Sequence, residues 1–299
     1  MNNIKSEFTI KDLENFSGIK AHTIRIWEKR YNLLEPNRTE SNIRYYDIYN
    51  LKKLLNVALL NNNGLKISKI AELTASKIAV EVRELVAKSG VKNQASNSLK
   101  LSMLNFDENL FNITYTNLIA QFSFREIFKN VFLPFLNEIG LLWQINSITP
   151  AHEHFISNLI KQKIHINIER LQVSKPVISD KIYVLYLPMN EIHELGLLYL
   201  HFELLLHGYQ SIYLGQSVPI NNLCDVQKVY KPICFVSYLT VEPSKQTILE
   251  YVKSIEEKVL VNKTDELWVL GRKIIENDEN LPFPNVKAFN SLDDLLKNL

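Results

Sequence analysis

Residues 8–46 read FTIKDLENFSGIKAHTIRIWEKRYNLLEPNRTESNIRYY, and this stretch decides the fold of the N-terminal part of the chain. Thr9 and Asp12 have the spacing of a capping box, so a first helix is predicted to begin here. Ser17-Gly18 ends that helix, because glycine readily takes the left-handed conformation that such a turn requires. A short helix followed at once by a glycine turn is typical of the first half of a helix-turn-helix.

The second half of the stretch combines a helix with a basic hairpin. Apolar spacing predicts a helix from about Lys20 to Arg30, with Ile24 and Trp27 on its buried side. After Pro36, residues 38–46 are predicted to form a small β-hairpin, or wing. Such a helix can lie in the major groove of DNA while the wing contacts the backbone. The residues predicted to contact DNA are Lys20, His22, Thr23, Arg25, Lys29, Arg30, Arg38, Thr39, Arg44 and Tyr45.

Charge is distributed unevenly along the chain. The net charge of the 299 residues is only +2, but residues 18–66 hold nine Lys and Arg against four Asp and Glu, which is +5 locally. A basic N-terminal block on a near-neutral body is typical of a modular nucleic-acid-binding protein. The alternative is a small helical bundle with a solvated basic face. That alternative does not account for basic residues on both the helix and the hairpin.

Other bulk properties limit the class of protein. A hydrophobic content of 46% with 22% charged residues predicts a globular chain, and its length predicts two or three domains. Cys224 and Cys234 lie in apolar surroundings and offer neither a disulfide framework nor a zinc site. The N-terminal residues lack the apolar core of a signal peptide, and no apolar run reaches membrane-spanning length. We therefore expect a soluble, cytoplasmic protein that does not bind membranes.

The periodicity of the sequence changes along the chain and divides it into domains. Residues 1–76 are predicted to form the DNA-binding domain, and residues 77–97, whose second half is rich in Ser, Asn and Gln, a linker. Residues 98–172 carry apolar residues at helical spacing and predict a four-helix bundle. In residues 181–299, short β-rich runs alternate with helix-length segments, which predicts a doubly wound parallel sheet. The predicted fold class is thus multidomain, α followed by α/β.

The N-terminal stretch closely resembles the MerR family of transcription regulators. The run TIKDLENFSGIKAHTIRIWEKRYNLLEP and the wing RTESNIRYY carry the resemblance and cover nearly the whole domain. It implies a winged helix-turn-helix that binds double-stranded promoter DNA as a homodimer or higher homo-oligomer, with RNA polymerase as a candidate partner. Trp27 stands where small-effector members often have tyrosine, which places the chain nearer the large-effector branch.

Two groups of residues in the remaining chain indicate a ligand site. Trp143 is followed after nine residues by Glu153-His154, and these side chains could line one cavity. The motif Glu191-x-His193-x-x-Gly196 comes directly after the first strand of the sheet, where parallel sheets bind ligands. A loop histidine can bind a metal through one nitrogen while a carboxylate orients the other. Taken singly, a core tryptophan, a solvated polar pair and a surface histidine are simpler interpretations.

Together the two groups resemble the cap and flavodoxin-like cobalamin module of methionine synthase and of light-sensing MerR repressors of the CarH/LitR kind. The cap signature is Trp-x9-Glu-His, and the sheet signatures are Asp-x-His-x-x-Gly, Ser-x-Leu and Gly-Gly. The resemblance implies that His193 is the lower axial cobalt ligand and that the serine and glycine positions accept the nucleotide tail. The residues that match are Trp143, Glu153, His154, Glu191, His193, Gly196, Ser237, Leu239 and Gly271.

Three positions depart from this family pattern. Glu191 replaces the aspartate and is one methylene longer, which could displace its hydrogen bond to His193. Arg272 replaces the second glycine, and its bulk could obstruct the nucleotide tail or pair with its phosphate. Gln144 stands where light-sensing members often have histidine, so the departure bears on the light response.

The sequence therefore predicts a transcription regulator with a winged helix, a helical cap and a flavodoxin-like domain, and not an enzyme. A cobalamin held between cap and sheet would control oligomerisation, and through it operator binding. One alternative is a degenerate module that serves only dimerisation or protein contacts. A second is a cobalamin-dependent enzyme, although the sequence offers no second substrate domain, zinc–thiolate cluster or Gly-rich phosphate loop.

Overall fold

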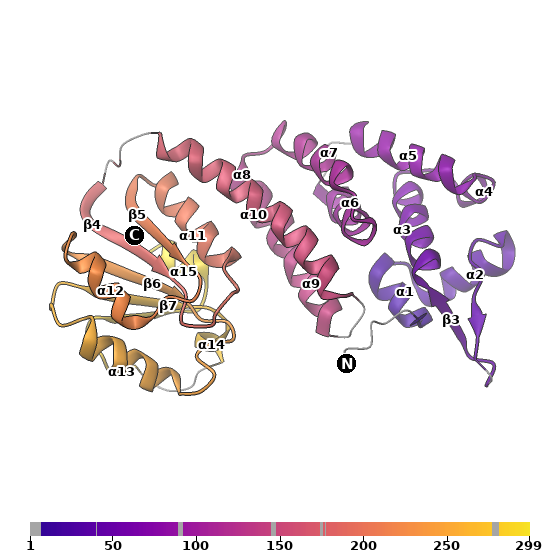
Figure 1. Ribbon diagram of the computed structural model, residues 1–299. Helices are drawn as coiled ribbons and strands as arrows, with labels where there is room; N and C mark the ends of the chain where they lie inside the picture. The colour runs from indigo at the N-terminus through magenta and orange to yellow at the C-terminus, as the bar shows by residue number, and fades with distance from the viewer. Residues whose placement is uncertain are drawn as a thin grey trace. The chain divides into compact units, whose positions relative to one another are not determined.

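The chain forms two compact units, Met1–Ile160 and Lys161–Leu299 (Figure 1). The first is helical apart from a small sheet, and the second is built on one parallel sheet, as the change of periodicity predicts. The computed structural model describes residues 7–39, 41–88, 92–144, 148–173, 176, 178–276 and 281–299.

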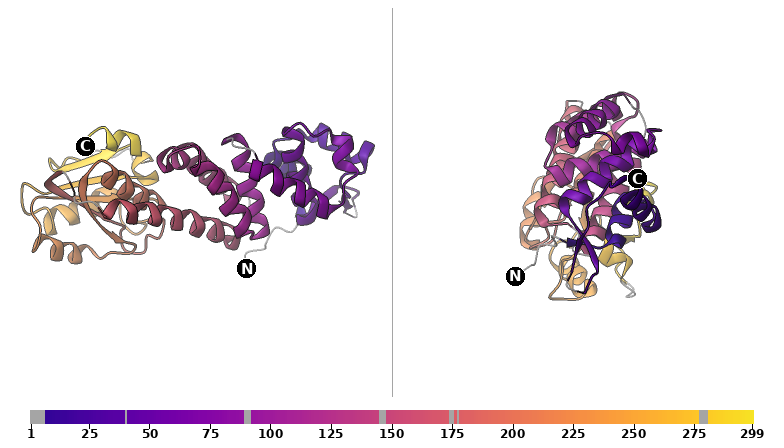
Figure 2. Two further views of the ribbon diagram at one scale, coloured as in Figure 1. Left: turned by 90° about the horizontal axis from the view of Figure 1, so that it is seen from above. Right: turned by 90° about the vertical axis from the view of Figure 1, so that its right-hand side faces the viewer.

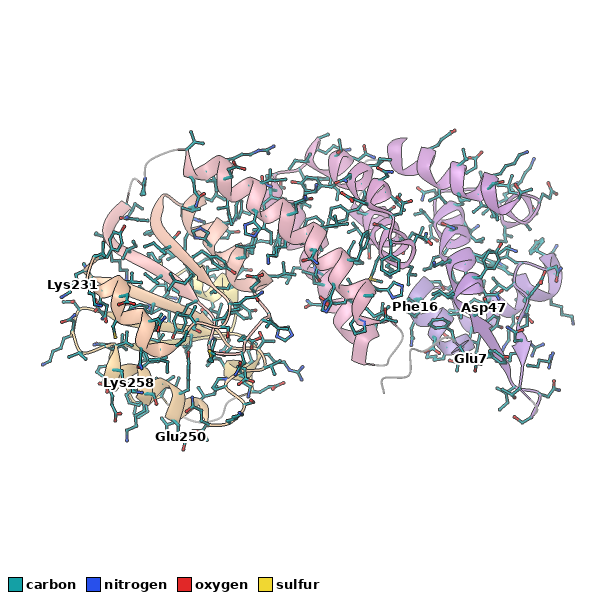
Figure 3. The ribbon with its side chains drawn as sticks, viewed as in Figure 1. Glu7, Phe16, Asp47, Lys231, Glu250 and Lys258 are labelled. Carbon is teal, nitrogen blue, oxygen red and sulfur yellow. The ribbon has the colours of Figure 1, made fainter. Side chains whose placement is uncertain are left out.

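The N-terminal domain is a helix-turn-helix with a three-stranded sheet. Thr9 and Asp12 form the predicted capping box, and Gly18 ends the first helix with a φ of 70°. Strand β3 lies in the middle and pairs antiparallel with β2 and with β1, where Glu7 lies opposite Asp47 (Figure 3). The predicted winged helix is confirmed. Its elements are β1 (Glu7–Phe8), α1 (Ile10–Ser17), α2 (Ala21–Tyr31), β2 (Asn37–Arg38), β3 (Arg44–Asp47), α3 (Ile48–Asn62) and α4 (Ile67–Ala71).

Apolar side chains at helical spacing form the core of this domain. Leu13 and Phe16 of α1 are fully buried, and the Phe8 ring meets Phe16 edge-on with 6.0 Å between centroids. Ile24 and Trp27 bury the inner side of α2, as predicted. Burial of each large apolar side chain contributes about 1.5–3 kcal/mol. This packing fixes which side of α2 is turned to solvent.

The predicted linker, residues 77–97, is helical wherever it is described. It belongs to α5 (Ala75–Lys88) and α6 (Lys92–Asn105). Ile78 and Val82 lie one helical turn apart and are both buried, and α5 packs against α3. The prediction of a linker was therefore wrong. Ser, Asn and Gln lower helix propensity only slightly, and the apolar residues among them decide the structure.

The predicted helical cap is present and is centred on phenylalanine side chains. Phe111 and Phe132 are fully buried and stack with 6.2 Å between ring centroids. Phe128 meets Phe132 edge-on at 6.4 Å. The cap consists of α6, α7 (Glu108–Ile119), the continuous run of α8 (Phe124–Ile127), η1 (Phe128–Phe132) and α9 (Leu133–Gln144), and α10 (Pro150–Gln172).

One buried lysine joins the cap to the helix-turn-helix. The Lys100 side chain of α6 is 8% exposed, and its Nζ lies 2.5 Å from Glu138 Oε1 of α9. The same ammonium group donates to the carbonyl oxygen of Phe16, at the end of α1, at 3.3 Å. The winged helix and most of the cap therefore belong to one unit, not to two domains separated by a linker.

Helix α10 is 23 residues long and runs across the division between the units. Beyond the division, Lys161 forms an ion pair with Glu194, which also accepts a hydrogen bond from the Tyr213 hydroxyl at 2.7 Å. These contacts attach the second half of α10 to the sheet. Among the helices in the described ranges, none combines the length and the apolar character that a membrane span requires.

The second unit is a five-stranded parallel sheet with the strand order β5-β4-β6-β7-β8. Helices return the chain between successive strands, which confirms the predicted flavodoxin-like, doubly wound fold. Its elements are β4 (Ile178–Tyr186), α11 (Leu195–Leu206), β5 (Tyr209–Gly215), α12 (Ile220–Gln227), β6 (Ile233–Tyr238), α13 (Ile248–Lys258), β7 (Glu266–Leu270), α14 (Arg272–Ile275), β8 (Val286–Phe289) and α15 (Leu292–Leu296).

Both faces of this sheet are covered by helices (Figures 1 and 2). Helices α11 and α15 pack on one face, over a core that contains Leu185 and Trp268. Helices α12 and α13 pack on the other, over Val184 and Phe235. Because β4, β6 and β7 are neighbours, the loops that follow them meet at one edge of the sheet.

Candidate functional site

The surface predicted to read DNA is formed by α2 and the wing. Its inner side packs into the core, so the opposite side of α2 presents its basic side chains to solvent. Exposed Arg and Lys side chains can contact phosphates and guanine edges. Of the predicted contacts, Thr23 and Tyr45 are half-buried, and the exposed residues are Lys20, His22, Arg25, Lys29, Arg30, Arg38, Thr39 and Arg44.

Polar groups within the wing order its tip. Arg38 Nη1 donates to Asn42 Oδ1 at 2.6 Å, and the backbone N–H of Thr39 donates to Ile43 O at 2.9 Å. Asn42 takes a positive φ of 62°, which asparagine tolerates better than most residues. Arg38 lies directly opposite Arg44 in the pairing of β2 with β3. The hairpin thus presents two arginines side by side.

Glu28 of α2 connects the helix to the wing. Arg44 Nε donates to Glu28 Oε1 at 3.1 Å, and the Tyr46 hydroxyl donates to Glu28 Oε2 at 2.8 Å. Burial, together with the hydrogen bond to Glu28, raises the pKa of the fully buried Tyr46. An open groove of about 580 Å³ lies here, and Arg25, Lys29 and Arg44 are among the residues that line it.

Sequence reasoning missed Glu28. It follows Ile24 by four residues, so the spacing already placed it near the buried side of α2. Its acidic charge gave no sign of a role at a surface that contacts phosphates, because an isolated carboxylate would repel them.

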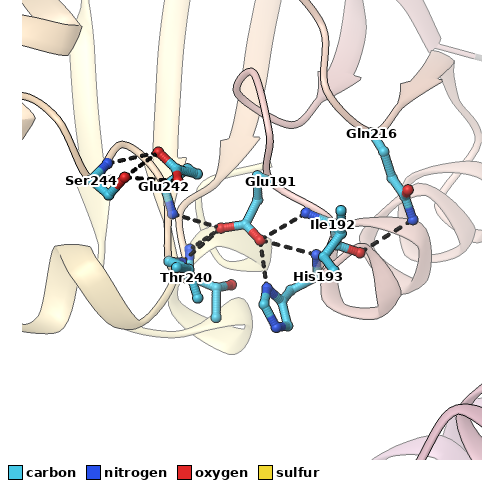
Figure 4. A network of polar contacts seen from close by, with 8 residues as sticks. Glu191, Ile192, His193, Gln216, Thr240, Glu242 and Ser244 are labelled. Atoms are coloured by element: carbon cyan, nitrogen blue, oxygen red, sulfur yellow. Dashed lines mark hydrogen bonds and ion pairs between the residues drawn. The ribbon is translucent and has the colours of Figure 1, made fainter. Parts of the chain in front are cut away.

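At the carboxyl edge of the sheet, one buried carboxylate connects two loops (Figure 4). Glu191 follows β4, and its side chain is fully buried. Its Oε1 accepts hydrogen bonds from the backbone N–H groups of Ile192 and His193 at 2.9 and 3.0 Å. Its Oε2 accepts three more from the loop after β6, from the N–H groups of Thr240, Val241 and Glu242 at 3.2, 2.7 and 2.9 Å.

The same carboxylate orients the candidate cobalt ligand. Glu191 Oε1 lies 2.5 Å from His193 Nδ1, so the extra methylene does not displace this hydrogen bond, contrary to expectation. Burial alone would raise the pKa of Glu191, but the hydrogen bonds from His193 and from the backbone of Glu242 and Val241 hold that pKa well below its usual range. With Nδ1 on the carboxylate, Nε2 is the nitrogen that can bind a metal. The His193 side chain is 48% exposed.

Gly271 lies against the loop after β6. Its φ is 114°, and a Cβ atom there would lie 2.5 Å from Leu239 O and 2.8 Å from Leu239 N. Glycine is therefore required by the close approach of two backbones. Arg272, the next residue, is 63% exposed, and its Nε bonds Glu276 Oε1 at 2.6 Å. The arginine side chain thus lies on the surface of α14.

Ser237, at the end of β6, has a poorly satisfied hydroxyl. Its Oγ is buried and makes no hydrogen bond of good geometry within the described part of the chain, although the hydroxyls of Tyr186 and Tyr251 are close enough to interact with it. The hydroxyls of Tyr186 and Tyr251 lie nearby and bond each other at 3.3 Å. A buried hydroxyl without a hydrogen bond of good geometry is a group that a bound ligand could satisfy. This observation fits the nucleotide tail that the family resemblance assigns to the serine.

Gly196, the last residue of the Glu191-x-His193-x-x-Gly196 motif, lies against an aromatic ring. A Cβ atom on Gly196 would lie 2.9 Å from Cε2 and 3.0 Å from Cζ of Tyr238. The close approach that glycine allows here is that of the tyrosine ring. Tyr238 is the middle residue of the Ser-x-Leu motif, and sequence reasoning gave it no role.

In the cap, Glu153 and His154 are in contact. Glu153 Oε2 lies 2.6 Å from His154 Nδ1, and Glu153 Oε1 accepts a hydrogen bond from Ser157 Oγ at 2.6 Å. The His154 side chain is 68% exposed. Trp143 lies in α9, and its side chain is outside the described part. The cap residues and His193 belong to different units, so their shared cavity stays a prediction.

Two family models match the chain. Residues 8–77 match the MerR HTH family of regulatory proteins, and residues 95–166 match the B12 binding domain. Among solved structures, the monomethylamine corrinoid protein of Methanosarcina barkeri has a TM-score of 0.54 at 13% identity, and the match covers 66% of this chain and 92% of that one. At this identity the likeness shows the fold alone.

Curated relatives match over most of their length. The HTH-type transcriptional repressor CarH of Myxococcus xanthus is 26% identical over 72% of this chain and 73% of that protein. The repressor CarA of the same organism is 28% identical, and the match covers 70% of this chain and 68% of that protein. This chain is therefore similar to the CarH and CarA repressors over about 70% of its length, and it matches the MerR HTH family at its N-terminus and the B12 binding domain in the segment that follows.

Proposed function

We propose that this protein is a MerR-type transcription regulator that senses a cobalamin and so controls its binding to promoter DNA. The observation that carries the ligand part is the pair of Glu191 and His193, in which a buried carboxylate holds one imidazole nitrogen at 2.5 Å. A histidine held in this way, at the carboxyl edge of a doubly wound sheet, is suited to bind a metal through its other nitrogen.

Several residues would hold the ligand. His193 would bind the cobalt through Nε2, with its imidazole oriented by Glu191. The Ser237 hydroxyl and the backbone near Gly271 would accept the nucleotide tail, and Trp143, Glu153 and His154 would cover the upper face. Bound cobalamin would supply a cobalt ion whose upper ligand can be exchanged.

Binding to DNA would be the output of the molecule. The exposed residues of α2 would read the major groove, and the wing would contact the backbone. We propose a homodimer or higher homo-oligomer on DNA, in which the ligand shifts the assembly and thereby the avidity for two half-sites. Contact with RNA polymerase would complete the regulation. The homology to two repressors favours regulation over enzymatic turnover.

Electron paramagnetic resonance tests the ligand assignment directly. The full-length protein is labelled with nitrogen-15 at histidine, loaded with cob(II)alamin and desalted. An axial nitrogen-14 splits the cobalt lines into triplets, whereas nitrogen-15 splits them into doublets, so a protein histidine ligand gives doublets. His193→Ala should abolish the doublets, and the matched control His165→Ala, an exposed histidine of the same unit, should keep them.

Two results would contradict this assignment. Triplets in the labelled protein would mean that the nucleotide base of cobalamin, and not His193, binds cobalt. A desalted protein without any visible cobalamin absorption would leave a regulator whose B12-binding part serves only dimerisation or protein contacts.

The DNA part is tested with a duplex selected from a random-sequence pool by the full-length protein. Arg25→Ala should weaken binding to this duplex, because Arg25 is exposed on the outer side of α2. If the lost contact is a phosphate, the slope of log K against log salt falls by about 0.9 for each contact. Affinity that does not change would remove Arg25 from the DNA-reading surface.

A further inference from the structure

We propose that Glu28 is a positioning residue for DNA binding, which holds the wing against α2. The role rests on the proposed binding of DNA by this surface. A carboxylate on a DNA-reading helix would ordinarily weaken binding, because it repels phosphates. The contacts of Glu28 point to the opposite effect.

The two donors to Glu28 come from one strand. Arg44 and Tyr46 are two residues apart on β3, so their side chains lie on the same side of the strand. Each bonds a different oxygen of Glu28, at 3.1 and 2.8 Å. β3 is also the middle strand of its sheet and carries the wing strand β2 by pairing. One side chain of α2 thereby fixes the whole hairpin.

Burial separates this contact from an ordinary surface ion pair. The Glu28 side chain is 13% exposed, and Tyr46 is fully buried. The buried hydroxyl of Tyr46 depends on Glu28 as its acceptor. The Arg44 side chain is 42% exposed, and its guanidinium compensates the charge of Glu28 at the groove between helix and wing.

The sign of one substitution distinguishes the two roles. Glu28→Gln keeps an acceptor for Tyr46 but removes the charge that holds Arg44. If Glu28 were only a negative charge near DNA, its removal would tighten binding. If Glu28 positions the wing, binding to the selected duplex weakens although the protein gains positive charge. We expect a loss of about tenfold, which corresponds to 1.4 kcal/mol.

Glu35→Gln is the matched control. Glu35 is exposed and lines the same groove, so the substitution makes the same change of charge at the same place. It should leave affinity unchanged or tighten it. Arg44→Ala should weaken binding about as much as Glu28→Gln, and the double variant should be no weaker than Arg44→Ala alone, because both remove one contact. Tyr46→Phe, which keeps the buried ring, tests the second donor.

The assay measures affinity of the full-length variants for the selected duplex at one salt concentration, with circular dichroism melting to confirm folding. Binding by Glu28→Gln that is as tight as wild type or tighter would overturn the positioning role, as would additive losses in the double variant. If the wild-type protein selects no duplex from the pool, the proposed DNA binding itself is overturned, and the role of Glu28 falls with it.

Discussion

Glu28 and Glu191 are both carboxylates that hold two segments of the chain together, but they differ in burial and in the number of donors. Glu28 is 13% exposed and accepts one hydrogen bond at each oxygen, both from side chains. Glu191 is fully buried and accepts five bonds from backbone N–H groups in addition to that from His193. The first connects a helix to a hairpin, and the second connects two loops of a sheet.

The difference indicates how each region can respond to change. When its acceptor is lost, the partly exposed guanidinium of Arg44 can turn to water, whereas the buried hydroxyl of Tyr46 cannot. Backbone N–H groups cannot reorient without a change in the conformation of their loop. The wing is therefore held by two side-chain contacts, whereas the loops at the sheet edge are held through their backbones. Four substitutions or conditions test this contrast, from the largest expected effect to the smallest.

Glu191→Ala should destabilise the sheet unit by roughly 3–5 kcal/mol, because it removes a buried carboxylate and leaves five backbone donors of two loops and the His193 imidazole without their acceptor. Chemical denaturation, monitored by hydrogen exchange of the β4 amides, measures the change in the free energy of unfolding of that unit. Glu276→Ala, an exposed carboxylate of the same unit, is the control and should change stability by less than about 0.5 kcal/mol. A loss for Glu191→Ala as small as the control would erase the contrast between the two carboxylates.

Acid should weaken the sheet unit through His201. This imidazole is buried on α11, and its Nδ1 lies 2.9 Å from Ser211 Oγ. Burial, with a smaller effect of His165, lowers the pKa of His201 to about 4. In the unfolded chain the His201 imidazole binds a proton below about pH 6.5, whereas in the folded protein it stays neutral down to about pH 4. Above pH 6.5 the imidazole is neutral in both states, so the free energy of unfolding has its full value there. Between pH 6.5 and pH 4 the free energy of unfolding falls by about 1.4 kcal/mol for each pH unit.

Urea denaturation between pH 4.5 and 7 measures this slope. His201→Gln keeps a polar group but removes the titration, so the variant should show a flatter profile. Equal slopes for the variant and the wild type would assign the acid sensitivity to other groups.

Glu138→Ala should destabilise the first unit by about 2 kcal/mol, because it leaves the buried ammonium of Lys100 without its counter-charge. The loss is smaller than for a fully buried pair, since the Glu138 side chain is 33% exposed. Lys100→Met should cost less, because Glu138 can then turn to water. The two variants are compared by thermal unfolding, and the reverse order would show that the packing of Lys100, and not its charge, matters.

Glu28→Ala should cost about 1–2 kcal/mol of stability, mainly because it leaves the buried hydroxyl of Tyr46 without its acceptor, while the ion pair with the 42% exposed Arg44 adds less. The substitution should reduce DNA affinity more than it reduces the stability of the free protein. Denaturation of the free protein measures the change in stability. A loss of stability close to that of Glu191→Ala would show that the wing is as fixed as the sheet loops.

The sequence predicted most of the fold, because the deciding signals are local. The capping box at Thr9, the turn at Gly18 and the alternation of strands and helices after residue 181 each follow from near neighbours in the chain. The linker prediction failed at residues 77–97, where polar composition hid a buried stripe that includes Ile78 and Val82. Composition averages over a window, whereas packing depends on which face each residue occupies.

The site was predicted in part, and its gaps have a common cause. The family signature located His193 and Glu191, but the donors from Thr240 to Glu242 lie about fifty positions later in the sequence. Tyr238 against Gly196, and Lys100 on the carbonyl of Phe16, are likewise contacts between distant segments. A single sequence carries no direct sign of such pairs, because each partner taken alone has an ordinary local environment.

The anchoring of the His193 loop has a consequence for the kinetics of ligand capture. Five backbone bonds to Glu191 set the conformation of this loop during folding, so little conformational entropy would remain to be lost when a ligand arrives. Association would then be governed by the encounter with a surface that already has its shape. Rapid-mixing measurements would show an observed rate that rises linearly with cobalamin concentration, without the plateau of a slow rearrangement.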